Sequence, residues 1–113
     1  YIVTQMFFNN QKYFDFVDRC REEGITIPII PGLKPLTTNT HLTFLPKLFH
    51  IDIPENLADA VEACGQNKES IKQVGIEWAI QQSKELKERG VPCLHYYTMG
   101  KPDVINAIVS KVF

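Results

Sequence analysis

The sequence has 113 residues, with 12 basic and 13 acidic side chains and a formal net charge of −1 at pH 7. A balance this close to neutral gives no chain-wide field that would attract nucleic acid or an anionic membrane surface. Hydrophobic residues make up 44% of the chain, and no run approaches the roughly 18 apolar residues that a membrane span needs. These properties indicate one globular domain, or part of one, with neither a nucleic-acid nor a membrane partner.

The cysteines and the start of the chain indicate the redox state and the cellular compartment of the protein. Cys20, Cys64 and Cys93 are odd in number and far apart, so they form none of the close pairs typical of zinc or redox motifs. We expect reduced and mostly buried thiols. The chain starts at Tyr1 without a signal segment, which predicts a start within a domain and a cytoplasmic protein.

Hydrophobic periodicity predicts three strand-helix units in succession. Asn9-Asn10 supplies turn chemistry after the first apolar run, and Gly24 and Gly90 stand where helices should end. The predicted strands cover residues 1–8, 27–32 and 91–99. The predicted helices cover the stretch between Asn10 and Gly24, then 54–64, 70–89 and 103–113, with a loop over 33–40 and a short helical turn at 41–45.

Alternation of strands and helices favours a parallel sheet, either open or closed into a barrel. Polar residues within parallel strands need partners or a ligand, because helices normally cover both faces of such a sheet. Period-two alternation places them on common faces, and active sites of parallel barrels lie at the carboxyl ends of the strands. The residues expected to share a face are Val3, Gln5 and Phe7 in the first strand, and Cys93, His95 and Tyr97 in the third.

Few residues carry an independent chemical signal. The chain has no glycine-rich dinucleotide fingerprint, Walker loop or nucleophile elbow, and its histidines are not at metal-binding spacing. The turns at 31–34 and 99–101 each join a glycine to a lysine and weakly resemble phosphate cradles. His95 is predicted to be a core histidine and Glu77 a carboxylate at a helix-sheet rim. Gln5 stands out, because its amide both donates and accepts, which suits the edge of a heterocycle.

Four segments together resemble the methylenetetrahydrofolate reductase family, a group of flavoenzymes of one-carbon metabolism and methionine biosynthesis. These segments are Val3–Phe8, Ile29–Gly32, Val74–Glu77 and Leu94–Thr98. The resemblance implies a parallel (β/α)8 TIM barrel of which this chain supplies three consecutive strand-helix units, strands six to eight. Residues 1–113 would then be the C-terminal part of a single TIM-barrel catalytic domain, an incomplete barrel without a separate second domain.

The resemblance also implies a reaction. In the family, NADH or NADPH passes a hydride to FAD, and the flavin reduces 5,10-methylenetetrahydrofolate to 5-methyltetrahydrofolate. Motif matching assigns substrate-binding positions to Gln5, His41 and Lys101, with Tyr97 as a neighbouring wall residue and Val3 as a flavin contact. Many relatives have arginine where Lys101 stands, which keeps the charge but not the planar fork. No catalytic residue is expected within this segment, and most FAD contacts would lie outside it.

Two other interpretations remain open on sequence grounds. The three units could form a small open-sheet α/β binding module without redox activity. Alternatively, they could be half of a phosphate-binding barrel from a different enzyme, which the two glycine-lysine turns would allow. In the family interpretation, we expect the isolated segment to be inactive and the protein to form a homo-oligomer.

Overall fold

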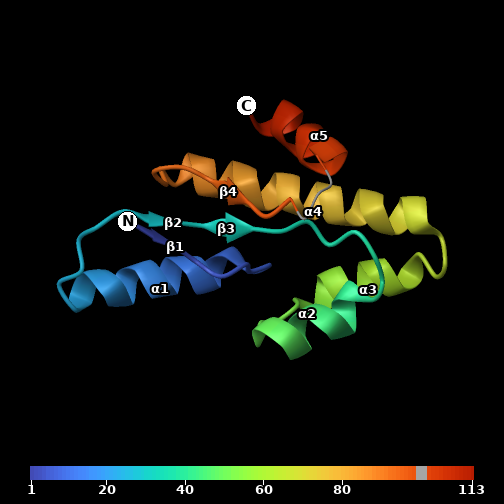
Figure 1. Cartoon of the computed structure of the whole chain (residues 1–113), viewed down its shortest axis with the longest axis horizontal. Helices are drawn as coiled ribbons and strands as arrows, with labels where there is room; N and C mark the ends of the chain where they lie inside the picture. Colours follow the sequence, from blue (N-terminus) through green and yellow to red (C-terminus); the bar gives the residue numbers. More distant parts are fainter. Residues whose placement is uncertain (99–101) are drawn as a thin grey trace.

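The computed structural model describes residues 1–98 and 102–113 as a mixed α/β fold with short parallel strands and five helices among those residues (Figure 1). The strands are β1 (Ile2–Val3), β2 (Ile29–Ile30), β3 (Gly32–Leu33) and β4 (His95–Tyr96). The helices are α1 (Asn10–Glu22), α2 (His41–Phe49), α3 (Glu55–Ala63), α4 (Lys68–Glu88) and α5 (Pro102–Val112).

The strands form two parallel pairs that share one continuous middle segment. β1 pairs with β2 through Ile2 opposite Ile29, and β3 pairs with β4 through Gly32 opposite His95. Pro31 separates β2 from β3, and a proline cannot donate a ladder hydrogen bond. Its carbonyl still accepts from His95 N at 3.0 Å. The three segments therefore lie side by side in chain order, which confirms a parallel α/β arrangement.

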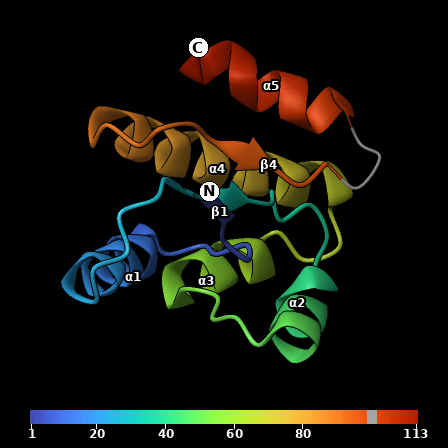
Figure 2. The same cartoon turned by 60° about the vertical axis from the view of Figure 1, so that its left-hand side comes forward.

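One face of these strands is covered by α1 and α4. A buried cluster joins Tyr13 and Cys20 of α1, Ile29 and Leu33 of the strands, and Leu86 of α4. The Tyr13 hydroxyl donates to the Ile29 carbonyl at 2.6 Å. In Figures 1 and 2, α5 lies beside α4, and Tyr96 of β4 packs against the cluster that the two helices share. The contact between the two helices buries Ile76, Ala79, Val104, Ile108 and Val112.

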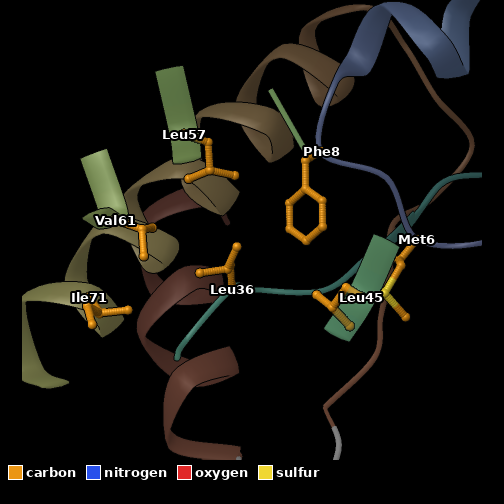
Figure 3. Close-up of a cluster of buried hydrophobic side chains, with 7 residues drawn as sticks. All are labelled: Met6, Phe8, Leu36, Leu45, Leu57, Val61 and Ile71. Atoms are coloured by element: carbon orange, nitrogen blue, oxygen red, sulfur yellow. The ribbon is translucent and has the colours of Figure 1, made fainter. Parts of the chain in front are cut away.

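A separate core fixes α2 and α3 beyond the carboxyl ends of the strands (Figure 3). Its center includes Leu36, which follows β3, and Gly75 of α4 lies so close that an added Cβ would overlap the Leu36 carbonyl oxygen. Glycine is therefore required where α4 meets the 33–40 segment. The buried members of this core are Met6, Phe8, Leu36, Leu45, Leu57, Val61 and Ile71.

All three strands are shorter than the sequence predicts. The first ladder ends where Thr4 N donates to Ile30 O at 3.0 Å, so residues 5–8 lie beyond it. The carbonyls of Phe7 and Phe8 accept instead from side chains of α4, Gln82 Nε2 at 3.2 Å and Trp78 Nε1 at 2.8 Å. Phe7 also leaves the face predicted for it, because its ring stacks on Tyr13 of α1 at a centroid distance of 5.6 Å.

The segment predicted as a short turn at 41–45 is a helix that continues past Pro46. α2 runs from His41 to Phe49 and ends at His50, which adopts a left-handed conformation with φ of 54°. Proline removes one N–H from the helix, yet the buried Leu45 anchors α2 in the core of Figure 3. Packing outweighs the local cost, which is why the prediction from Pro46 alone was wrong.

The three cysteines are free, but the expectation that they are mostly buried is wrong. Cys20 is buried in α1, Cys64 is half-buried at the end of α3, and Cys93 is exposed before β4. Among the described helices, none is both long enough and apolar enough to cross a bilayer.

Candidate functional site

The face of the strands opposite α1 and α4 is open in this chain. Val3 and Ile30 are in register across β1 and β2, and Gly32 and His95 are in register across β3 and β4. Ile29 and Leu33 point into the helix-covered core. Period-two alternation therefore places Val3, Ile30, Gly32 and His95 on the other side of the strands. We call this surface, made by Val3, Ile30, Gly32, His95 and Tyr97, the open face. Its side chains are half-buried or exposed, apart from the buried Gly32.

Tyr97 links all three strand segments at their carboxyl ends. Its hydroxyl donates to the Thr4 carbonyl at 2.8 Å, while its ring covers Gly32 and meets the His95 ring edge-on at 4.7 Å. Thr4 Oγ1 accepts from Gly32 N at 3.0 Å. Sequence reasoning missed Thr4 and Gly32 as parts of this arrangement, although a threonine within an otherwise apolar run was a visible signal.

Gln5 follows directly after Thr4 and is exposed. Its Oε1 accepts from the adjacent Met6 N at 3.0 Å, and its Nε2 makes no hydrogen bond to any residue that the structure describes. The structure therefore does not support the alternative in which Gln5 is a core amide bonded to neighbouring strands. An exposed amide at the end of β1 is available to a ligand.

His41 is the first residue of α2, and its Nδ1 accepts from Thr37 N at 3.1 Å. In a neutral imidazole this bond places the proton on Nε2. Leu45, one helical turn after His41, and Met6, the neighbour of Gln5, belong to the same buried core (Figure 3). Lys101, the remaining predicted substrate contact, lies outside the described residues.

Other sequence predictions fail on local contacts. The turn at 31–34 is no phosphate cradle, because Gly32 lies in β3 with its N–H bound to Thr4 Oγ1, and Lys34 is buried. The second glycine-lysine turn, at 99–101, lies outside the described residues. His95 is exposed rather than a core residue, and Glu77 lies on the exposed side of α4, where Gln73 Nε2 donates to it at 3.2 Å.

The larger hollows lie away from the open face. One of about 520 Å³ lies between the 37–39 loop and the starts of α4 and α5. Lys72 and Asp103 form an ion pair of 3.2 Å at its edge, and the hydrogen bond from Lys72 lowers the pKa of the Asp103 carboxyl. Within residues 1–98 and 102–113, no group of three histidine, cysteine or acidic residues could hold a metal ion.

Comparison with known protein families identifies the family of this chain. The family model described as "Methylenetetrahydrofolate reductase" matches residues 1–112. The chain belongs to the methylenetetrahydrofolate reductase family. This match confirms the resemblance that the four sequence segments indicated.

Relatives within the methylenetetrahydrofolate reductase family are longer than this chain. A probable methylenetetrahydrofolate reductase (NADPH) of Caenorhabditis elegans is 32% identical over 113 residues, which cover 99% of this chain and 17% of the relative. Methylenetetrahydrofolate reductase (NADH) 1 of Arabidopsis thaliana is 34% identical, with 88% and 17% covered. The 5,10-methylenetetrahydrofolate reductase of Escherichia coli is 31% identical, with 94% and 36% covered. The chain thus spans about a third or less of these relatives.

A solved structure shares the fold. It is described as an uncharacterized protein from Clostridium thermocellum that binds two copies of 5-methyl-5,6,7,8-tetrahydrofolic acid. Its TM-score to this chain is 0.55 at 19% identity, and the match covers 97% of this chain and 41% of that one. At this identity the likeness concerns the fold alone. The assignment of the three strand segments to strands six to eight of a barrel stays a prediction.

Proposed function

We propose that this segment forms the folate-side wall of a longer methylenetetrahydrofolate reductase. That protein would use NADH or NADPH and FAD to reduce 5,10-methylenetetrahydrofolate to 5-methyltetrahydrofolate. The observation that carries the proposal is the exposed amide of Gln5, which follows the last ladder residue of β1 in a chain of this family. The remainder of a barrel, outside this segment, would close the pocket over the open face.

Gln5 is proposed to recognise the pterin edge of the folate. A pterin presents adjacent hydrogen-bond donors and acceptors, and an amide can satisfy one of each through Nε2 and Oε1. Its Oε1 is bound only to the neighbouring Met6 N, a contact within the same stretch of chain. Exchange of that local bond for ligand contacts requires no rearrangement of the strands.

The other assigned positions have distinct proposed functions. His41 would line the pocket from the start of α2, and the ring of Tyr97 offers an aromatic surface on the open face. Lys101 would meet the glutamate part of the folate as a point charge, an interaction that salt weakens. The folate-binding protein of Clostridium thermocellum, which shares this fold, supports folate as the ligand class.

Among the residues that the structure describes, the apolar surface of the open face fits FAD. Val3 and Ile30 are half-buried aliphatic neighbours on the open face, and such side chains suit the flat ring of a flavin. When bound, FAD would accept hydride from the nicotinamide and deliver it to the folate. This chain's own residues orient the folate and exclude water; the remaining FAD contacts would come from outside the segment. A cytoplasmic setting also stays a prediction.

A half-reaction experiment tests the assignment of Gln5 in the full-length protein that carries this segment. Gln5→Ala should slow oxidation of the reduced flavin by methylenetetrahydrofolate by about 10- to 100-fold, or about 1.4 to 3 kcal/mol, for loss of an oriented hydrogen bond. Reduction of the flavin by the nicotinamide should change much less. Stopped-flow flavin absorbance separates the two steps.

Gln81→Ala is the matched control, because Gln81 is an exposed amide on α4, far along the chain from the strand ends. It should leave both half-reactions unchanged. If Gln5→Ala instead lowers the melting temperature, releases flavin and slows both half-reactions equally, Gln5 is structural. A colourless full-length protein that takes up no flavin would favour the binding module without redox activity.

A further inference from the structure

We propose that Tyr97 is a positioning residue for Gln5 that acts through the Thr4 carbonyl, and that its hydroxyl does not bind the substrate. This inference rests on the proposed function of Gln5. It gives the Tyr97 hydroxyl a structural function, a clamp across the strand ends, in addition to the aromatic surface proposed for the ring.

Thr4 is held by hydrogen bonds at all three of its polar groups. Its N–H donates to Ile30 O at 3.0 Å, and its Oγ1 accepts from Gly32 N at 3.0 Å. Its carbonyl oxygen accepts from the Tyr97 hydroxyl at 2.8 Å. Two other strand segments therefore fix the backbone and the side chain of this one residue.

The Tyr97 bond acts on the peptide unit that carries Gln5. The Thr4 carbonyl and the Gln5 N–H belong to one planar peptide, so rotation at Thr4 would move the acceptor away from the Tyr97 hydroxyl. The β1 ladder has already ended at Thr4, and Gln5 itself is exposed. The hydroxyl thus holds the last peptide before the amide that is proposed to meet the substrate.

The ring that delivers this hydroxyl has little freedom to move. A Cβ added to Gly32 would lie 2.7 Å from Tyr97 Cε2 and 2.6 Å from the Thr4 carbonyl oxygen, so the ring and the carbonyl both use the space that glycine leaves. The His95 ring also contacts the Tyr97 ring edge-on, at a centroid distance of 4.7 Å. The aromatic ring spans β3 and reaches β1 from the end of β4.

Hydroxyl chemistry separates this function from substrate binding. A tyrosine hydroxyl has one proton to donate, and Tyr97 donates it to Thr4. Donation to a folate would require release of the Thr4 carbonyl. The Tyr97 hydroxyl therefore affects folate binding through the orientation of Gln5.

A double-mutant cycle in the full-length protein tests the proposal. Tyr97→Phe should weaken binding of 5-methyltetrahydrofolate, measured by calorimetry, by about three- to tenfold, as loss of one hydrogen bond allows. The same change in a Gln5→Ala background should have no further effect on folate binding. The Michaelis constant for the nicotinamide should stay at the wild-type value in each case.

Tyr96→Phe is the matched control. The Tyr96 hydroxyl also has one side-chain partner, Ser83 Oγ at 2.7 Å, but it lies on the helix-covered side of β4. Tyr96→Phe should leave folate affinity unchanged. A second pair of variants acts on the clamp from β1: Thr4→Val, which removes the acceptor for Gly32 N, should weaken folate binding, and Thr4→Ser should restore it.

The outcomes distinguish failure of the proposed Gln5 function from failure of the Tyr97 positioning inference. If Gln5→Ala leaves folate binding intact, the proposed function of Gln5 fails and the positioning inference fails with it. If Gln5→Ala weakens binding but the effect of Tyr97→Phe multiplies it in the double mutant, Tyr97 contacts the substrate directly and only the positioning inference is overturned. Wild-type affinity of Tyr97→Phe would overturn it as well.

Discussion

Gly75→Ala provides a direct test of how α4 supports the site. Gly75 is buried in the middle of α4, and an added Cβ would overlap the carbonyl oxygen of Leu36. Leu36 cannot move aside easily, because its side chain is fully enclosed in the core that holds α2. In a helix without this contact, alanine would be favoured over glycine by about 1 kcal/mol.

The clash outweighs that preference. Overpacking costs about 1 to 3 kcal/mol, and a clash with backbone falls at the upper end, so we expect a net loss of about 2 kcal/mol after the gain in helix propensity. Urea unfolding of the full-length protein measures this change. The control compares Lys84→Gly with Lys84→Ala at an exposed position of α4, where alanine should be the more stable. If Gly75→Ala is as stable as the wild type or more stable, the close approach of α4 to Leu36 is refuted.

Three further predictions follow from the structure. Asn67→Ala should cost about 1 kcal/mol in urea unfolding, because Asn67 Oδ1 caps α4 by accepting from Ser70 N at 3.1 Å; an unchanged midpoint would contradict the cap. Burial raises the pKa of Tyr96 above its ordinary 10.0, although the Ser83 hydrogen bond acts in the opposite direction. The contribution of Tyr96 to folding stability is therefore complete below pH 10 and is lost as pH rises through the raised pKa. Thermal melts should show a smaller loss of melting temperature at alkaline pH in Tyr96→Phe than in the wild type. The isolated segment should associate or stay molten, because β1 and β4 each pair on only one side among the described residues. It should also retain no FAD. A compact, cooperatively unfolding monomer in sedimentation, or stoichiometric flavin absorbance after desalting, would contradict these expectations.

Helices were the most predictable part of the fold. α4 and α1 were identified to within a few residues because apolar side chains recur at helical spacing and a glycine follows each helix. Gly24 and Gly90 adopt φ of 84° and 77°, the left-handed region in which glycine is favoured. α2 was the exception, because Pro46 is a local signal and the burial of Leu45 is a tertiary one.

Strand lengths were less predictable for a physical reason. Residues 1–8 together have the β-branched and aromatic composition of a strand, but composition reports a tendency to lie on a half-buried surface and does not specify the hydrogen-bond partner of residues 5–8. Here the donors are the side chains of Trp78 and Gln82. Nothing near residues 5–8 in the sequence encodes that choice.

Part of the candidate site could be selected from the sequence. Gln5 could be selected because it is polar within an apolar run, and the family resemblance gave it a ligand. The clamp on Thr4 could not be inferred, because it depends on the Tyr97 ring crossing Gly32 to reach another strand. Such a contact depends on the three-dimensional register of the strands.

The bonds from α4 to the Phe7 and Phe8 carbonyls also have a consequence for synthesis of the protein. Their donors, Gln82 and Trp78, are 75 and 70 residues further along the chain, so they leave the ribosome later than their acceptors. At about 5 to 20 residues per second, that delay is about 4 to 15 s. Throughout this interval the carbonyls of Phe7 and Phe8 lack the two side-chain donors that bind them in the folded structure. The nascent chain is therefore most exposed to misassembly, and to chaperone capture, before α4 emerges.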